Sequence, residues 1–187
     1  MRLIALTGYA RSGKNTVASI IREEANTLVN EIAFADPMKD FCREVFGFSE
    51  AQLYGNEREK PDARWTRPDG TPLTARFALQ TLGTEWGRAC DPNLWVKAGI
   101  NRARRLFDSG ATLVVFTDCR FLNEARAVSE AGGEVWRIRR DVPQLSHASE
   151  REIWSPEMNE FVSAEIDNSE SLEATRIRVV QLLMHAR

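Results

Sequence analysis

The sequence predicts a three-layer α/β domain, in which helices cover both faces of a parallel sheet of about five strands. Short apolar runs of strand length alternate along the chain with segments whose apolar residues recur at helical spacing. Strands separated by helices need right-handed crossover connections, and these place parallel strands in one sheet with helices on its two faces. A chain of 187 residues that is 43% hydrophobic is also large enough to form one domain with a proper core.

Two strands and two helices are predicted in the N-terminal part. The apolar run of residues 3–7 ends in glycine, which is typical of a buried strand. From Lys14 the apolar residues recur at helical spacing as far as Leu28. A second strand is expected over residues 32–35. Pro37 then opens a helix, since proline is favoured at the first helical position.

The middle of the chain is predicted to be helical after a polar stretch. Residues 54–74 combine three prolines, two glycines and many charges. A segment of this length without regular structure is expected to be functional or mobile. Helical spacing follows from Thr74 to Trp86, and again over residues 92–107.

The C-terminal part continues the alternation. Residues 113–116 are nearly all apolar, as in a strand covered on both faces. A helix is predicted over residues 123–131 and a strand over residues 134–138, with a Gly-Gly pair between them. A last strand over residues 161–166 and a helix from Ser171 close the chain.

Composition excludes several classes of protein. The net charge of −2 gives no basic field, so binding of nucleic acid through bulk charge is not expected. No apolar run approaches the length of a membrane span, and the N-terminus becomes glycine-rich too early for a signal peptide. The three cysteines lack CxxC spacing, which indicates a reduced, cytoplasmic protein.

The segment GYARSGKNT matches the GxxxxGK pattern of a phosphate-binding loop. Its glycines let successive backbone N–H groups point at phosphate oxygens, the following helix adds its positive end, and the lysine reaches the terminal phosphates. Its position between a buried strand and an amphipathic helix is the context that this motif requires. We expect the loop to bind ATP through seven residues: Gly8, Arg11, Ser12, Gly13, Lys14, Asn15 and Thr16.

The end of this loop departs from many phosphate loops. Asn15 stands where Ser or Thr often ligates magnesium, and Thr16 follows one place later. The GKxT ending resembles the nucleoside monophosphate kinases, adenylate kinase among them. Magnesium would then be held by Thr16 and Asn15 largely through water, which suits its reluctance to dehydrate.

Two carboxylates follow predicted strands, and each has two interpretations. Ligands of such sheets lie beyond the carboxyl ends of the strands. Asp118 at that edge could orient magnesium and its waters, or could cap the helix that follows. Asp36 has the same ambiguity, because Pro37 at a first helical position makes it a natural N-cap.

Polar residues recur every four positions along the helix that is predicted after Thr74. This stripe consists of Arg76, Gln80, Thr84 and Arg88. A solvated helix face is one interpretation. The other interpretation is a clamp for the phosphate and the base of a bound nucleotide, since Arg binds phosphate as a bidentate fork.

Three further residues are ambiguous. Trp95 and Trp65 could stack on a base, although a tryptophan in a helix usually belongs to the core. Arg140 could reach the ATP phosphates or could be exposed at the end of its strand.

Six phrases together resemble the bacteriophage deoxynucleoside monophosphate kinases, a branch of the P-loop nucleoside monophosphate kinases. They are GYARSGKNT, FADPMKD, TARFALQTLGTEWGR followed by DPNLW, TDCRFLNEA, HASE and AEIDNSESL, and all but the last lie within residues 3–150. The resemblance implies a P-loop kinase fold and transfer of the ATP γ-phosphoryl group to a deoxynucleoside 5′-monophosphate. It also implies Mg²⁺, breadth toward several bases, a homodimer and, for a phage-encoded enzyme, the host cytoplasm.

The resemblance also assigns residues and regions. It implies one kinase domain over residues 1–187, with an acceptor-binding insertion at about 37–108 and a lid-like loop at about 141–158. Lys14, Arg76, Arg88 and Asp118 would be catalytic. The acceptor would be bound by Asp36, Lys39, Arg76, Gln80, Gly83, Thr84, Arg88, Trp95, Asp118, Arg120 and Glu124.

Two positions depart from the family pattern. The family often has Asp where Asn15 stands, so a negative charge near magnesium is missing here. A basic residue often follows the arginine at position 76, whereas Phe77 follows here, which leaves the acceptor phosphate more dependent on Arg76 and Arg88.

Two other functions remain open at this stage. A P-loop kinase could phosphorylate a hydroxyl of a nucleoside or a modified base, which would need a general base such as Asp36 or Asp118. A phosphate acceptor needs none, because its oxygen is already ionised at neutral pH. A nucleotide-sensing or DNA-associated P-loop protein without catalysis would bind ATP but show no turnover that depends on a monophosphate.

Overall fold

The computed structural model describes residues 1–142 and 151–185. By its contacts the chain divides into two compact units, the first made of Met1–Phe34 and Gly99–Arg187 and the second of Ala35–Ala98. Part of the predicted lid-like loop, and the HASE phrase with it, lies outside the described residues.

The first unit contains a parallel sheet of five strands in the order β2-β5-β1-β6-β7. The strands are β1 (Arg2–Thr7), β2 (Val29–Ile32), β5 (Leu113–Cys119), β6 (Glu134–Arg139) and β7 (Val162–Asp167). The central strands β1 and β5 are almost entirely buried, which explains their unbroken apolar sequence.

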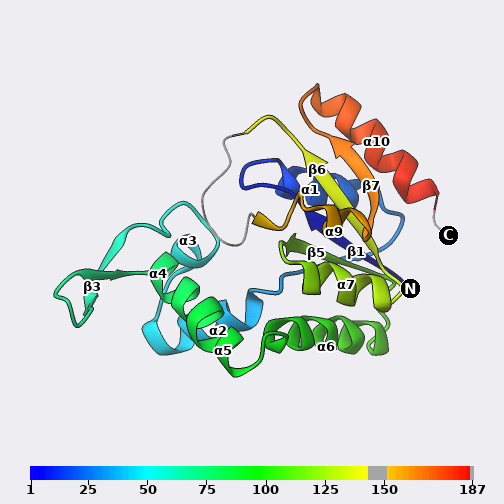
Figure 1. Ribbon diagram of the computed structural model, residues 1–187. Coiled ribbons are helices and arrows are strands. Elements are labelled where there is room, and N and C mark those ends of the chain that lie inside the picture. Colours follow the sequence, from blue (N-terminus) through cyan, green and yellow to red (C-terminus); the bar gives the residue numbers. More distant parts are fainter. Residues whose placement is uncertain (143–150, 186–187) are drawn as a thin grey trace. The chain divides into compact units, whose positions relative to one another are not determined.

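Helices lie on both faces of this sheet (Figure 1). The helices of the first unit are α1 (Lys14–Glu24), α7 (Leu122–Glu130), α9 (Pro156–Asn159), α10 (Leu172–Met184) and the part of α6 (Leu94–Asp108) that follows Gly99. On one face, α1 and α10 pack on a core that includes Leu6, Trp136 and Ile166. On the other, Gly99 of α6 lies against the stacked rings of Phe34 and Phe116. The predicted fold class is confirmed.

The second unit is a small helical bundle with a hairpin. It contains α2 (Asp36–Phe46), α3 (Glu50–Leu53), the hairpin strands β3 (Pro61–Thr66) and β4 (Pro72–Thr74), α4 (Ala75–Gln80), a π-helical segment η1 (Thr81–Gly87) and α5 (Arg88–Cys90). Its core is a cluster of buried residues: Cys42, Phe48, Leu53, Ala75 and Ala78.

Three expectations about the elements were wrong. Helix α1 ends at Glu24, and Leu28 beyond it is 78% exposed. The second strand pairs over Val29–Ile32 instead of 32–35, because the buried residues that follow it lie in a turn. Residues 54–74 are not a structureless segment, since most of them form the β3–β4 hairpin and its approaches.

Neither carboxylate caps a helix. The N-cap of α2 is Ala35, and Asp36 lies inside the first helical turn. Asp118 is the penultimate residue of β5, and the backbone N–H groups of Arg120 and Phe121 at the start of α7 donate to Glu124 instead.

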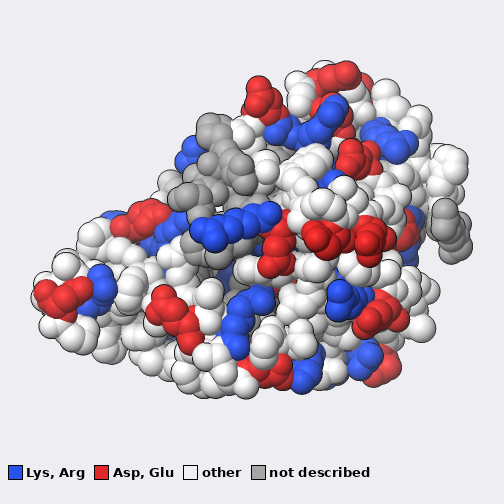
Figure 2. All heavy atoms as spheres, in the orientation of Figure 1, with Lys and Arg blue, Asp and Glu red and all other residues white. Residues whose placement is uncertain are grey.

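Charges of both signs alternate over the face of the molecule drawn in Figure 2. Such mixing matches the small net charge of −2 and gives that face no large field of one sign. Among the described residues, no helix is both long and apolar enough to cross a bilayer.

Candidate active site

The predicted site residues divide between the two units. The phosphate loop with Asp118, Arg120, Glu124 and Arg140 belongs to the first unit. The remaining predicted acceptor residues, from Asp36 to Trp95, belong to the second.

The phosphate loop has the backbone that an anion site needs. Gly8 and Gly13 have φ angles of 146° and 99°, and Arg11 is the one described non-glycine residue with positive φ. Gly13 is the N-cap of α1, and no side chain caps this helix. The N–H groups of a first helical turn have no acceptor within their own helix, and at a glycine-rich loop they are the groups that bind phosphate.

The two glycines are also required by their neighbours. A Cβ at Gly8 would lie 2.5 Å from the carbonyl oxygen of Ile138, and one at Gly13 would lie 2.0 Å from Nδ2 of Asn168. Both contacts are shorter than any side chain tolerates. The loop thus packs directly against the neighbouring strand end and the turn after β7.

Backbone carbonyl groups of the phosphate loop hold the Lys14 side chain in place. Its side chain is buried, and its ammonium group donates to the carbonyl oxygens of Gly8 (2.7 Å) and Tyr9 (2.8 Å). These bonds place a positive charge beside the uncapped helix terminus. Asn15 and Thr16 are exposed on the first turn of α1, and Ser12 is buried.

Asn168 stabilises the loop, and the sequence analysis did not identify it. Its Nδ2 donates to the carbonyl oxygen of Ser12 (2.9 Å), and its Oδ1 accepts from the hydroxyl of Thr175 on α10 (2.9 Å). Its backbone N–H donates to the carbonyl oxygen of Arg139 (2.8 Å). A polar residue directly after the last strand, at the ligand-binding edge of such a sheet, is the signal that could have pointed to it.

The remaining predicted residues of the first unit have different surroundings. One carboxylate oxygen of Asp118 accepts from the backbone N–H of Phe34 (2.8 Å), which ties β5 to the end of the β2 region. Glu124 is buried, and its Oε2 accepts from the N–H groups of Arg120 (2.7 Å) and Phe121 (3.1 Å), so it shapes the turn before α7. Arg140 is exposed beyond β6.

In the second unit, Asp36 and Lys39 form a buried pair on α2. Lys39 Nζ lies 3.7 Å from Oδ1 of Asp36 and 4.1 Å from the centre of the Tyr54 ring. Burial raises the pKa of Tyr54, and the nearby carboxylates of Asp36 and Asp40 act in the same direction, while Arg43 opposes them. The ammonium group of Lys39 is therefore stabilised both by the carboxylate of Asp36 and by the face of the Tyr54 ring.

The predicted stripe crosses from an α-helix into a π-helix. Arg76 and Gln80 lie on α4, Thr84 lies on η1, and Arg88 begins α5. In a π-helix the hydrogen bonds run from i to i+5, and such segments frequently occur at functional sites. Whether these four residues form a solvated face or a clamp stays a prediction.

Trp95 packs under this segment. Its indole N–H donates to the carbonyl oxygen of Gly83 (2.8 Å), and a Cβ at Gly87 would lie 2.5 Å from its ring. Gly83 is also closed in by Met38, whose sulfur would lie 2.7 Å from an added Cβ. These contacts give Trp95 and Gly83 a role in supporting η1. Likewise, the Trp65 N–H donates to the carbonyl oxygen of Phe46 (2.9 Å).

The Arg76 side chain is 40% exposed and forms an ion pair (3.1 Å) with Glu59, whose side chain is 69% exposed. Exposed pairs of this kind contribute little stability, so the guanidinium can exchange this partner for a phosphate at small cost. The chemistry of Arg76 is therefore compatible with binding an anionic acceptor.

The hairpin of the second unit depends on Asp62. This buried carboxylate accepts from Nε2 of Gln52 (2.9 Å) and from the backbone N–H, Nε and Nη2 of Arg64 (3.0, 2.9 and 2.7 Å). The Arg64 and Gln52 hydrogen bonds hold the pKa of Asp62 well below its ordinary value.

We expect the stability of this hairpin to fall in acid. Because the folded pKa of Asp62 lies below the unfolded value of about 3.9, its contribution is complete above that pH and declines as pH falls further. Urea unfolding at pH 7 and at pH 3 would measure the loss, with Asp62→Asn as the comparison. An equal loss in the native protein and in Asp62→Asn would contradict the assignment.

No family model matches the chain. A curated protein of Acanthamoeba polyphaga mimivirus, named "Putative deoxynucleotide monophosphate kinase", is 31% identical over 199 residues, covering 100% of this chain and 98% of its own length.

Two solved structures have a similar fold. An unliganded sugar kinase from Janibacter sp. HTCC2649 matches with a TM-score of 0.51 at 14% identity, over 100% of this chain and 96% of its own. The dephospho-CoA kinase from Campylobacter jejuni matches with a TM-score of 0.50 at 12% identity, over 98% of this chain and 96% of its own. At these identities the likeness establishes the fold alone.

Proposed function

Because the chain belongs to the deoxynucleotide monophosphate kinase family of its full-length mimivirus relative, we propose that it transfers the γ-phosphoryl group of ATP to a deoxynucleoside 5′-monophosphate. The observation that carries the proposal is the phosphate loop, where Lys14 lies beside an uncapped helix terminus. The relative comes from a giant virus, so the expected phage branch stays a prediction, as does the homodimer.

In the proposed reaction, the loop binds the phosphates of ATP through the N–H groups at the start of α1. The ammonium group of Lys14 moves from the Gly8 and Tyr9 carbonyls, or shares them, to neutralise charge on the terminal phosphates. The attacking oxygen belongs to the acceptor's phosphate and is already ionised, so no general base is needed. Catalysis then consists of alignment and charge neutralisation.

Magnesium fits this chain through water and phosphate rather than through a cage of side chains. The described residues contain no group of three or more His, Cys, Asp or Glu side chains that could hold a metal. Thr16 and Asn15 offer exposed oxygen atoms on the first turn of α1, and such an outer contact suits Mg²⁺. When bound, Mg²⁺ would neutralise charge on the transferring phosphoryl group.

The decisive assay is ADP release with a panel of acceptors. We expect turnover with ATP and deoxynucleoside monophosphates, and none with the matching nucleosides. Turnover with nucleosides would favour a hydroxyl-directed kinase with Asp36 or Asp118 as the base. ATP binding without turnover on any acceptor would favour a nucleotide sensor.

Arg76 supplies the test of the acceptor site. We expect Arg76→Ala to raise the KM for the monophosphate about tenfold or more, the usual effect of losing a charge-assisted hydrogen bond, while the KM for ATP changes little. Arg104→Ala, which removes an exposed guanidinium from α6, is the matched control. An unchanged acceptor KM in Arg76→Ala would remove this residue from the acceptor site.

A further inference from the structure

A buried guanidinium in the first unit has two N–H donors without a partner. The Arg137 side chain, on β6, is only 3% exposed, and its Nη1 donates to Oε1 of Glu165 on β7 (3.0 Å). Its Cζ lies 4.4 Å from the centre of the Trp154 ring. Its Nε and Nη2 atoms are buried and make no hydrogen bond with any residue that the structure describes.

These two donors form one edge of the guanidinium. Nη1 lies on the side of Cδ, so Nε and Nη2 point together in the other direction and form a fork. Such a fork matches the two oxygens of a carboxylate. Burial lowers the pKa of Arg137, whereas Glu165 opposes that shift, and an arginine remains charged in proteins. Leaving charged donors unpaired in a buried position is costly, which indicates that a partner binds there.

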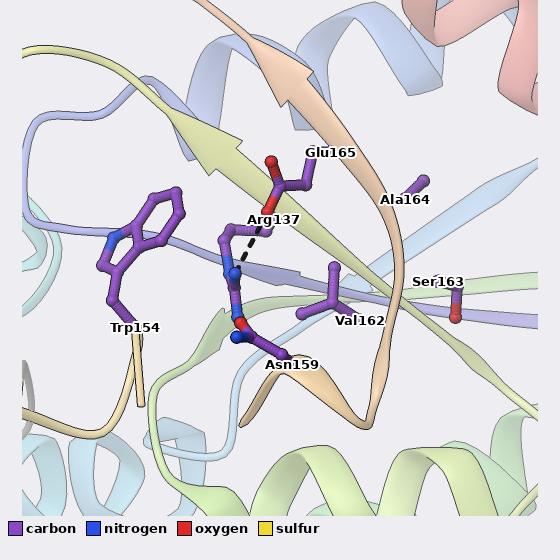
Figure 3. A pocket seen from close by; sticks show the side chains of 7 residues that line it. All are labelled: Arg137, Trp154, Asn159, Val162, Ser163, Ala164 and Glu165. Carbon is purple, nitrogen blue, oxygen red and sulfur yellow. Dashed lines mark hydrogen bonds and ion pairs between the residues drawn. The ribbon is translucent and has the colours of Figure 1, made fainter. Parts of the chain in front are cut away.

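The guanidinium lines an open pocket of about 530 Å³ (Figure 3). Asn159 points toward Arg137 from α9, Trp154 flanks it, and the stretch of β7 from Val162 to Glu165 forms the other side. The indole N–H of Trp154 is a further buried donor without a partner. The pocket therefore combines three unpaired N–H donors, an amide and an aromatic wall.

We propose that this pocket binds a small organic carboxylate through the Nε–Nη2 fork of Arg137. Glu165 already neutralises much of the single positive charge, so a monoanion fits better than a phosphate dianion. The Arg137 guanidinium already covers one face of the Trp154 ring, so Val162 and Ala164 together with Trp154 form the apolar wall for the body of the ligand. The pocket adjoins the proposed ATP site, because Trp154 belongs to the predicted lid-like loop and its ring lies 6.2 Å from that of Tyr9 in the phosphate loop. None of its residues is itself a predicted ATP or acceptor ligand, and a binding test that uses neither nucleotide can fail or succeed separately from the proposed function.

The pocket is open, but the two fork atoms are buried, so a ligand reaches them only if a neighbouring side chain moves. Trp154 is half-buried and lies in the turn before α9. Binding should therefore change the environment of the Trp154 indole as well as that of the guanidinium. Both groups carry an N–H that is observable by nitrogen-15 NMR.

The test is a titration of the full-length protein with sodium benzoate, acetate and inorganic phosphate. We expect saturable shifts of the Arg137 Nε–H and Trp154 Nε1–H resonances with the carboxylates, benzoate binding more tightly than acetate. Arg137→Met should weaken benzoate about tenfold or more. Arg139→Met, which removes an exposed guanidinium two residues along β6, should leave benzoate binding unchanged.

Three results would overturn the proposal: shifts that do not saturate, shifts that persist in Arg137→Met, or phosphate binding more tightly than benzoate. If Arg137→Met does not fold, the affinity of Glu165→Gln for benzoate tests the proposal instead. That variant keeps an acceptor for Nη1 but removes the opposing charge, so benzoate should bind more tightly. An unchanged affinity in Glu165→Gln would refute the carboxylate site.

Discussion

Lys14→Ala should fold normally and lose about a hundredfold or more of its ADP-release rate. The side chain is buried at the phosphate loop and presents the loop's ammonium group, and removal of a preorganised charge contact costs a few kcal/mol of transition-state stabilisation. Lys14→Met keeps the aliphatic stem without the charge. It should lose activity to a similar extent, which separates loss of charge from loss of packing.

The measurement is coupled ADP release at saturating ATP and deoxynucleoside monophosphate, with thermal unfolding as the check on folding. Lys97→Ala is the matched control, because Lys97 is an exposed lysine of the second unit that forms an ion pair with Asp91 at the surface. We expect its turnover to stay near normal. Near-normal turnover in Lys14→Ala would defeat the assignment of the loop.

The fold could be predicted where a buried element has a recognisable pattern of apolar residues. Strand β5 is covered on both faces, so its apolar run was sufficient to locate it. The same logic misplaced β2, because Ala33 and Phe34 are buried without pairing in the sheet. Apolar character reports burial, and it does not report hydrogen-bond pairing.

The β3–β4 hairpin was not predicted, although the sequence of its turn indicates it. Its turn contains Pro68, Asp69 and Gly70, a combination typical of tight turns. Its strands are mostly exposed, so they lack the apolar alternation that marks a strand with one buried face. The π-helix η1 left no such trace, since its residues have the same helical spacing as α4 and its geometry depends on packing by Trp95.

The sequence could predict those residues of the candidate site that lie together in one short motif. Residues of the phosphate loop follow one another, so their pattern identified them. Asn168 lies 156 residues from Ser12 in sequence, and the hydrogen bond between them depends on the order of β1, β6 and β7 in the sheet. Arg137 likewise became informative only once its partners and its unpaired donors were known.

Gly13→Ala should be among the most damaging single substitutions in the loop. A φ of 99° strains an alanine by roughly 1–3 kcal/mol, and its Cβ would lie 2.0 Å from the amide nitrogen of Asn168. Gly110→Ala isolates the first effect, because Gly110 has a φ of 96° and an added Cβ would meet nothing within 4 Å. The excess destabilisation of Gly13→Ala over Gly110→Ala measures the clash.

A double-mutant cycle then tests whether Asn168 is the group that clashes. Asn168→Ala alone leaves the Ser12 carbonyl and the Thr175 hydroxyl without this partner, at a cost of about 1–3 kcal/mol. In Gly13→Ala/Asn168→Ala the new methyl group occupies the space of the lost amide, so the combined cost should be smaller than the sum. Urea unfolding gives the free energies, and calorimetry of ATP binding reports whether the loop is restored.

Gly110→Ala/Asn168→Ala should be additive, because the two sites share no contact. Additivity in the Gly13 pair as well would mean that the loop yields to the methyl group by moving away from Asn168.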